Sequence, residues 1–225
     1  MKKILISILI LSMFFPLLVL GEEKKTEYIP NAKSGILIDV DSGTILFEKN
    51  PNKKLAEASL TKMMVELIFM EKLEEGKFKL TDKVKVSENA ASFGGSQIYL
   101  EANEEMTIDD LFKGLSVASA NDATVAIAEF LSGSEESFVK LMNKKAKELG
   151  LSNTVFKNSS GLDEEGHYTT AKDLSKLSRE LLKHEKILEY SSIYEDYLRE
   201  DTNNKFWLVN TNKVVFKIYN KSIIG

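Results

Sequence analysis

The amino-acid sequence predicts a mixed α+β domain whose helices occupy the middle of the chain. Three observations support this fold class. A two-strand hairpin pattern comes first, at residues 35–48. Apolar residues then recur at helical spacing between residues 58 and 184, and short apolar runs at 206–209 and 214–219 are typical of closing strands. We find no internal repeat and no low-complexity linker, so we expect one domain after the N-terminal segment.

The hairpin is predicted by two apolar runs on either side of a tight turn. Residues 35–40 are typical of a buried strand and residues 44–48 of the returning strand, with the sequence DSG between them. Pro51 ends the pattern, since proline cannot donate to a strand ladder.

The helices are predicted by apolar spacing and by residues suited to their ends. From Ala58 to about Leu73 the apolar positions follow a helical period, and Gly76 stops the helix. Thr107 and Ser134 each precede a pair of acidic residues, which suits a cap and the first turn of a helix. Further helices are therefore expected over residues 107–117, 121–133, 134–150 and 170–184, with short strands and loops over 77–106 and a long polar loop over 151–169.

Composition excludes several classes of protein. The chain has 225 residues, a formal net charge of −4 and no cysteine. Without cysteine there is no disulfide, thiolate zinc site or cysteine nucleophile. A mildly acidic balance argues against binding nucleic acid over a broad basic face. We expect no metal site, no cofactor and no nucleic-acid partner.

The N-terminal segment has the pattern of a secretory signal peptide. Lys2 and Lys3 precede an uncharged, mostly apolar run over residues 4–20, and Gly21 follows before a charged segment. We predict a signal peptide at 1–21, a polar lead-in at 22–33 and a catalytic domain at 34–225. The alternative is an uncleaved membrane anchor, although the run is slightly short of the roughly 20 residues that span a bilayer. With either a cleaved signal peptide or an uncleaved anchor, the rest of the chain is expected to be exported.

The sequence Ser59-Leu60-Thr61-Lys62 begins the first predicted helix. A spacing of three places Ser59 and Lys62 on one helix face, one turn apart. A serine becomes a useful nucleophile when a base takes its proton, and a lysine kept neutral by its surroundings can be that base. Free N–H groups at the helix start can stabilise an oxyanion. Taken alone, the motif also fits a capping serine beside a solvated lysine.

A second motif, Ser119-Ala120-Asn121, lies between two predicted helices. Both polar side chains could face a cleft from a short connector. The simpler alternative is that Ser119 is a turn residue and that Asn121 caps the next helix. In combination, the order hairpin, S-x-x-K and S-x-N is found in penicillin-binding proteins and class A β-lactamases.

The chain resembles the low-molecular-mass penicillin-binding proteins that are D-alanyl-D-alanine carboxypeptidases. The matching segments run in family order over nearly all of residues 28–219 and include SGILIDVDSGTILFEKN, ASLTKMM, TIDDLFKGLSVASANDATVAIAEFL, GHYTTAKDLSKLSRELL and NTNKVV. The resemblance implies a three-layer α/β/α fold of the β-lactamase/transpeptidase type. Such a fold has a five-stranded antiparallel sheet flanked by helices, next to a helical subdomain.

The resemblance also implies a role for each motif residue. Ser59 would be the acylated nucleophile, Lys62 its general base, Ser119 a proton shuttle to the leaving amine, and Asn121 the residue that positions the substrate amide. The reaction would release the terminal D-Ala of a peptidoglycan stem pentapeptide through an acyl-enzyme. β-Lactams would be covalent inhibitors, and the protein would work in the cell envelope, outside the cytoplasmic membrane and at its periphery. No oligomeric state is implied.

His167 lies in the long loop, which the family places near the mouth of the active site. We expect it to order the loop; the alternative is an ordinary surface or structural histidine. The neighbouring Asp163, Glu164 and Glu165 raise the possibility of a deacylating glutamate as in class A β-lactamases. The surrounding pattern favours the carboxypeptidases instead.

Two departures from the family pattern stand out. The family usually has a proline shortly before its serine, where this chain has Glu57-Ala58. The third family motif, K-T-G, does not follow Asn210-Thr211-Asn212, and the chain ends at Gly225. In the family that strand binds the substrate carboxylate and supplies half of the oxyanion hole; losing one such donor costs about a hundred- to a thousandfold in rate. We therefore expect a fragment, cut before its last strands, with low activity and stability.

Three functions follow as hypotheses. The first is a D-Ala-D-Ala carboxypeptidase, the second a truncated relative that binds cell-wall peptides without catalysis, and the third a β-lactamase. Covalent labelling of Ser59 by a penicillin separates the first from the second, and rapid turnover of a cephalosporin would favour the third.

Overall fold

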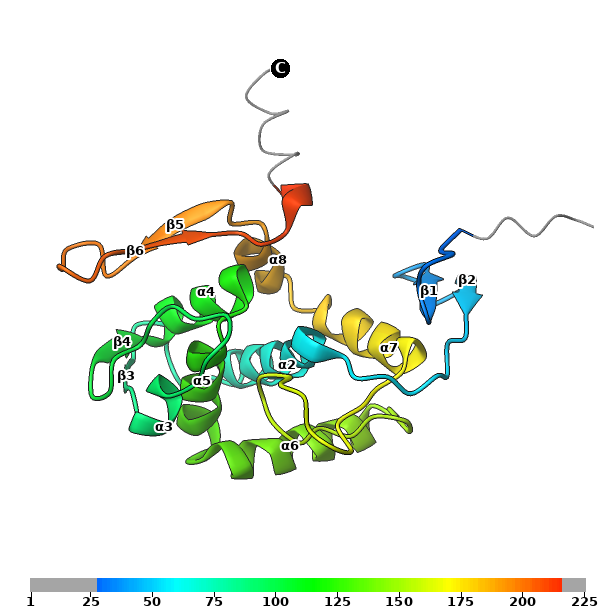
Figure 1. The fold of residues 1–225 in the computed structure, drawn as a ribbon, viewed down its shortest axis with the longest axis horizontal. Helices are drawn as coiled ribbons and strands as arrows, with labels where there is room; N and C mark the ends of the chain where they lie inside the picture. The colour runs from blue at the N-terminus through cyan, green and yellow to red at the C-terminus, as the bar shows by residue number, and fades with distance from the viewer. Residues whose placement is uncertain (1–27, 216–225) are drawn as a thin grey trace, which may run out of the picture. The chain divides into compact units, whose positions relative to one another are not determined.

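The computed structural model describes residues 28–215. The predicted signal peptide lies outside these residues. The chain divides into two compact units, up to Ala32 and from Lys33 onward. In the described part of the first unit, the N–H of Ala32 closes a turn on the carbonyl of Ile29 at 3.2 Å. The helices and strands belong to the second unit and are shown in Figure 1.

The predicted hairpin is present as β1 (Gly35–Ile38) and β2 (Ile45–Lys49), which pair antiparallel. The Asp39 carboxylate closes the turn by accepting from the backbone and the hydroxyl of Ser42 at 2.8 and 2.6 Å. These bonds hold the pKa of Asp39 below its usual range. The Arg179 guanidinium, on α7 (Ala171–Leu181), donates to the carbonyls of Val40 and Asp41 and ties the hairpin to the helices.

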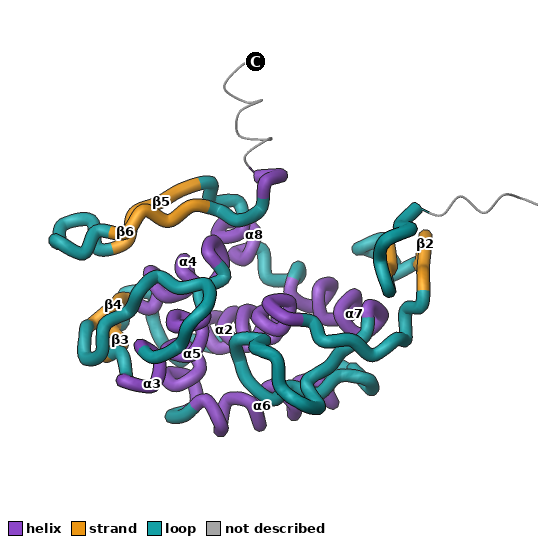
Figure 2. The backbone as a smooth tube through the Cα atoms, viewed as in Figure 1, coloured by secondary structure: helices purple, strands orange, loops and turns teal. Residues whose placement is uncertain are grey.

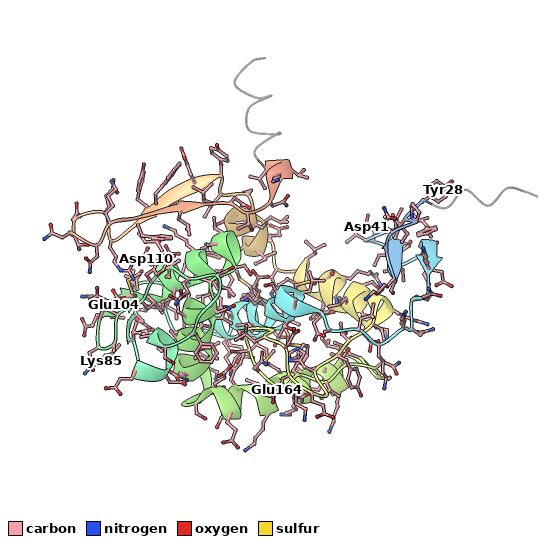
Figure 3. The ribbon with its side chains drawn as sticks, viewed as in Figure 1. Tyr28, Asp41, Lys85, Glu104, Asp110 and Glu164 are labelled. Atoms are coloured by element: carbon pink, nitrogen blue, oxygen red, sulfur yellow. The ribbon has the colours of Figure 1, made fainter. Side chains whose placement is uncertain are left out.

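Helix α2 (Lys62–Glu74) is the centre of the core. It contacts α5 (Asn121–Ser132), α6 (Glu135–Glu148), α7 and α8 (Lys186–Ser191). Its sequence is apolar around most of its circumference, as expected for a helix covered on several sides. Phe69 is fully buried and stacks on Phe112 of α4 (Ile108–Ala118), with the ring centroids 3.9 Å apart. Figure 3 shows the side chains crowded around this helix.

The caps predicted for the middle helices are confirmed. The Thr107 hydroxyl accepts from the N–H of Asp110 at the start of α4, and the Ser134 hydroxyl accepts from the N–H of Ser137 at the start of α6. Gly133 ends α5 with a φ of +80°, a left-handed conformation that glycine adopts without strain.

The structure departs from the predicted helices at two places. The helix expected over 58–73 divides into a 3₁₀ turn, η1 (Ala58–Thr61), followed by α2. The helix expected over 170–184 ends at Leu181, and α8 follows after a short turn. In the first case Ala58 has a φ of +49°, outside the right-handed helical region, so a regular α-helix cannot run through this residue.

The strands differ more. The predicted strand 206–209 is β6 (Phe206–Val209), but it pairs with β5 (Glu195–Leu198), which was not predicted. In the expected strand 214–219, Val214 and Val215 are helical, and the remaining positions lie outside the described residues. The segment 77–106 contains β3 (Lys83–Lys85), β4 (Glu105–Thr107) and an unpredicted short helix, α3 (Glu88–Ala91).

Strand pairing is antiparallel throughout residues 28–215, as the expected fold class requires. The strands form three separate two-stranded sheets, β1–β2, β3–β4 and β5–β6 (Figure 2). The five-stranded sheet implied by the family resemblance is therefore not assembled within this part of the chain. None of the described helices combines the length and the apolar character needed to cross a membrane.

Candidate active site

The turn before Ser59 is strained. Ala58 has a φ of +49°, in the left-handed region that residues with a side chain rarely adopt. Gly161, from the long loop, packs directly on this turn: a Cβ at Gly161 would lie 2.0 Å from the Ala58 carbonyl oxygen. The close approach requires a glycine, and it holds the Ala58 peptide in place. Ser59 is consequently exposed at the start of η1.

Lys62 is buried and held by two oxygen atoms. Its side-chain Nζ donates to Oδ1 of Asn121 and to the Ser160 carbonyl, both at 2.7 Å. Only 4 % of the residue is exposed. Burial disfavours the charged form and lowers the pKa of Lys62 to about 8, although the nearby Glu66 carboxylate acts in the opposite direction. A substantial fraction of Lys62 is therefore neutral slightly above neutral pH, as a general base requires.

Asn121 links three segments. It begins α5, and its Oδ1 accepts from Lys62 while its Nδ2 donates to the Gly94 carbonyl at 2.8 Å. Its backbone N–H donates to the carbonyl of Ser96 at 2.7 Å. A Cβ at Gly95 would lie 2.8 Å from Asn121 Nδ2, so the loop can wrap the amide only with glycine there. The capping alternative for Asn121 is wrong, because Ala120 occupies the N-cap position.

Ser119 lies at the C-cap of α4 in a left-handed conformation, with φ +56° and ψ +36°. This backbone turn separates α4 from α5. Ser119 is half-buried, and between residues 28 and 215 neither its hydroxyl nor that of Ser59 has a hydrogen-bond partner. The structure thus brings Lys62 and Asn121 into direct contact. It places Ser59 at the start of η1 and Ser119 at the C-terminal end of α4, two residues before Asn121.

Glu66 is a residue that the sequence analysis missed. It lies one turn after Lys62 on α2, and its carboxylate accepts from the Ser116 hydroxyl at 2.6 Å. Desolvation raises the pKa of Glu66 to about 7, against the lowering effects of Ser116 and of Lys62. An acidic residue four positions after Lys62, within an otherwise apolar stretch, was the available signal.

The loop over residues 158–167 closes the site on one side. The Asn158 side chain accepts from the Gly161 N–H at 2.8 Å and donates to the carbonyl of Leu162, which forms a tight bend. Ser159 is anchored by Glu135 of α6, through both its backbone N–H and its hydroxyl. This anchoring presents the next carbonyl, that of Ser160, to Lys62.

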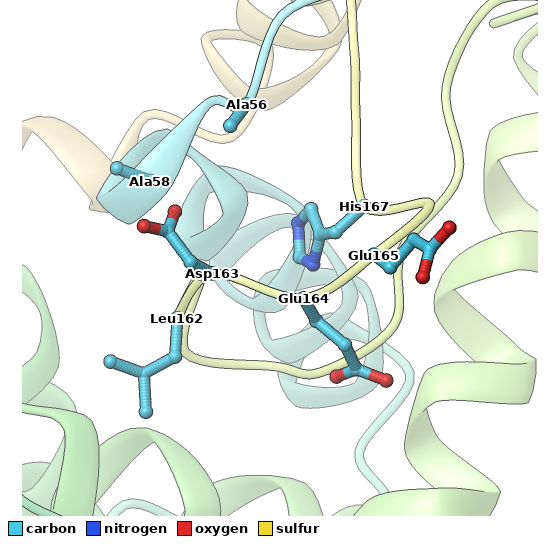
Figure 4. A pocket seen from close by; sticks show the side chains of 8 residues that line it. Ala56, Ala58, Leu162, Asp163, Glu164, Glu165 and His167 are labelled. Carbon is cyan, nitrogen blue, oxygen red and sulfur yellow. The ribbon is translucent and has the colours of Figure 1, made fainter.

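His167 is the last residue of this loop and is buried, so it is not a surface histidine. Its Nε2 lies 2.9 Å from Thr61 Oγ1 and 3.0 Å from Glu57 Oε1. A cavity of about 460 Å³ opens above it (Figure 4). The cavity is lined by Ala56, Ala58, Gly161, Leu162, Asp163, Glu164, Glu165 and His167.

The three acidic residues of the cavity are exposed. In Figure 4 the Glu164 and Glu165 carboxylates point away from the Ala58 turn. Glu164 accepts instead from the Asn158 amide at 3.1 Å. Nothing in this arrangement favours a deacylating glutamate. Over residues 28–215 no group of three or more His, Cys, Asp or Glu side chains could hold a metal ion.

The structure thus places an exposed serine three residues before a buried lysine at the start of a core helix, as the S-x-x-K motif predicted. Residues 22–223 match the family model of D-alanyl-D-alanine carboxypeptidases, and the chain belongs to that family. The family assignment made from the sequence is confirmed.

The curated relatives include carboxypeptidase DacF of Bacillus subtilis, 54% identical over 96% of this chain and 57% of that protein. Carboxypeptidase DacC of Escherichia coli is 37% identical, over 92% of this chain and 52% of that protein. The chain therefore spans about half the length of these relatives.

Solved structures show the same fold. Penicillin binding protein 5 from Haemophilus influenzae matches with a TM-score of 0.78 and 32% identity, over 84% of this chain and 54% of that one. The carboxypeptidase DacD from Francisella tularensis matches with a TM-score of 0.75 and 33% identity, over 79% and 43%. The β-lactamase/transpeptidase fold class predicted from the sequence is confirmed.

Proposed function

We propose that this chain carries the acylation site of a serine-type D-Ala-D-Ala carboxypeptidase. The observation that carries the proposal is the buried Lys62 amine, held between Asn121 and Ser160 and lowered in pKa to about 8, one turn from the exposed Ser59. No cofactor and no metal enters this chemistry.

In the proposed reaction, Oγ of Ser59 attacks the carbonyl of the penultimate D-Ala while neutral Lys62 takes its proton. The backbone N–H of Ser59, at the start of η1, is suited to stabilise the oxyanion. Collapse of the intermediate breaks the peptide bond. Ser119 passes a proton to the departing amine of the terminal D-Ala, and the amide of Asn121 positions the substrate. Water then hydrolyses the acyl-enzyme.

The substrate class is a peptidoglycan stem peptide, and β-lactams would acylate the same serine. The names of the relatives, carboxypeptidases and penicillin-binding proteins, support both assignments. A peptidoglycan substrate and the predicted signal peptide at 1–21 together support export to the cell envelope, at the outer face or periphery of the cytoplasmic membrane. Residues 34–225 would belong to the catalytic domain.

A fluorescent penicillin tests this function. We expect lasting covalent label on the chain, label lost in Ser59→Ala, and label kept in Ser152→Ala, a matched change at an exposed serine. Release of D-Ala from a pentapeptide should also be lost in Ser59→Ala and kept in Ser152→Ala.

The other outcomes assign other functions. A folded chain that binds pentapeptide but takes no label would be a non-catalytic binding protein. Label that turns over rapidly, together with hydrolysis of a chromogenic cephalosporin, would indicate a β-lactamase.

A further inference from the structure

A buried carboxylate–imidazole contact joins the turn before Ser59 to the loop that holds Lys62. Glu57 and His167 are each only 7% exposed, and Oε1 of Glu57 lies 3.0 Å from Nε2 of His167. Both groups come from segments that flank the proposed nucleophile and base, Glu57 from the turn before Ser59 and His167 from the loop that contains Ser160.

Among the described residues, the His167 imidazole is the ion-pair partner found for the buried Glu57 carboxylate. Within the described part of the chain, both of its oxygen atoms are buried and neither has an aligned hydrogen bond. A buried carboxylate is costly unless a positive or donating group faces it, so the imidazole is its stabilising neighbour. Nδ1 of His167 accepts from the Lys157 N–H at 3.4 Å, so a neutral ring would carry its proton on Nε2. That nitrogen lies 2.9 Å from Thr61 Oγ1 and 3.0 Å from Glu57 Oε1.

Both ends of this contact lie next to groups of the proposed reaction. Glu57 precedes the strained residue Ala58 and is two positions from Ser59. Thr61, the other neighbour of the imidazole Nε2, immediately precedes Lys62. On the loop side, the Ser160 carbonyl that binds Lys62 belongs to the same segment as His167. A shift of the loop would therefore move the turn that carries Ser59 and would also change the hydrogen bond from Lys62 to the Ser160 carbonyl.

We propose that Glu57 and His167 are positioning residues: their contact fastens the loop 158–167 to the turn 57–61 and so sets Ser59 relative to Lys62. The proposal rests on the acylation function proposed above. The other charged groups of this cavity, Asp163, Glu164 and Glu165, are exposed, and Lys157 contributes its backbone to the imidazole. Among the described residues, Glu57 is therefore the buried charged side chain in contact with the His167 imidazole.

The chain contains its own control. The sequence has two histidines, and the second, His184, contacts the exposed Glu74 at 2.8 Å. Glu57→Gln and Glu74→Gln thus make the same chemical change at a buried and at an exposed Glu–His pair. The second pair lies at the far end of α2, away from Ser59.

The first experiment is NMR of the imidazole nitrogens in the ¹⁵N-histidine-labelled chain, with His184→Gln for assignment. We expect the Nε2-protonated form at His167, and a shift of its ring signals in Glu57→Gln but not in Glu74→Gln. A proton on Nδ1 in the unsubstituted chain, or unchanged His167 signals in Glu57→Gln, would overturn the pairing. This measurement needs no enzyme activity.

The second experiment is the rate of acylation by fluorescent penicillin. Glu57→Gln and His167→Gln should each lower the rate at saturating penicillin at least tenfold, with less than a threefold change in the concentration at half-saturation. The double variant should be no slower than the slower single one, because the two residues act as one unit. Glu74→Gln should acylate like the unsubstituted chain.

The outcomes separate the two proposals. Unchanged acylation in a folded Glu57→Gln variant, or losses that multiply in the double variant, would refute the positioning role. An unsubstituted chain that takes no label would refute the acylation function and this role with it, while the ring spectrum would still decide whether the pair exists.

Discussion

The helices around α2 and the two outer hairpins bury their apolar residues to very different degrees. Met64, Phe69 and Leu111 are fully buried in the helical region, whereas Leu37 and Leu46 of the first hairpin are 56% and 62% exposed. In the C-terminal hairpin, Leu198 and Leu208 are buried on one face, and Trp207 is 57% exposed on the other. A helix satisfies its own backbone and only needs its apolar face covered. A two-stranded hairpin gains stability mainly from what packs on it.

The difference matters because the proposed catalytic groups belong to the helical region. Ser59 and Lys62 come from η1 and α2, and Ser119 and Asn121 from the junction of α4 and α5. Lys62 and Asn121 are thus buried in the helical region, whereas Ser59 is exposed at the start of η1. The comparison predicts that changes in the helical region are severe and that changes on the exposed hairpin faces are mild.

The largest effect is expected at Lys62. Lys62→Met removes the proposed base but keeps most of the apolar stem, so acylation by penicillin should fall by about a thousandfold, within the range of general-base catalysis. Stopped-flow or gel-based labelling measures this rate. Lys77→Met, at an exposed lysine just beyond the same helix, is the matched control and should leave the rate unchanged. A Lys62→Met variant that still acylates within tenfold of the parent would remove Lys62 from the mechanism.

A pair of aromatic substitutions tests the comparison of the two regions directly. Phe69 is fully buried between Phe78 and Phe112, so Phe69→Ala should lower the free energy of unfolding by about 3–5 kcal/mol. Trp207 faces solvent and pairs across the hairpin with Tyr197, so Trp207→Ala should cost less than about 1 kcal/mol.

Urea unfolding followed by circular dichroism measures both values. Similar losses in the two variants would mean that the hairpin is as tightly packed as the helical core. The stated difference between the two regions would then be wrong.

The next effect is expected at the loop that closes the site. Gly161 has a φ of +82°, and a Cβ there would lie 2.0 Å from the Ala58 carbonyl oxygen. Gly161→Ala should therefore cost roughly 2 kcal/mol or more of stability through backbone strain and displacement of the turn, and it should slow acylation. Gly76 also has a positive φ, +69°, but nothing lies within 4 Å of a Cβ added there. Gly76→Ala therefore measures the cost of backbone strain without the steric clash. Equal losses in the two variants would show that the contact with Ala58 has no effect of its own.

The helical region was also the part that the sequence predicted best. Thr107, Ser134 and Gly133 mark helix ends by local chemistry, which can be recognised without knowing the fold. Strand β5 was missed because Glu195-Asp196-Tyr197-Leu198 has little strand propensity and pairs through contacts made elsewhere in the fold. The break after Leu181 has no proline or glycine to signal it.

Within the site, the motifs identified Ser59, Lys62, Ser119 and Asn121 as candidates, but not how they contact one another. Pairing of Lys62 with Ser160 depends on a loop about a hundred residues away in sequence, and that distance leaves no local pattern. The same holds for Glu57 with His167. Burial of Lys62, which lowers its pKa, is likewise a property of the packed helices and not of the motif.

The smallest effect is expected from Glu66, and it concerns pH. Protonated Lys62 cannot accept the serine proton, so acylation should rise with pH through the pKa of Lys62, about 8. The Glu66 carboxylate raises this pKa, so Glu66→Gln, which can still accept from Ser116, should move the midpoint of the profile to lower pH by up to about one unit. The sign follows from charge: without the carboxylate, the ammonium form loses a stabilising neighbour. Glu75→Gln, at an exposed position just after the same helix, should not move the midpoint. A midpoint that stays fixed in Glu66→Gln would show that the two groups do not interact and that burial alone sets the pKa of the base. A midpoint that rises would reverse the expected sign of the Glu66 effect.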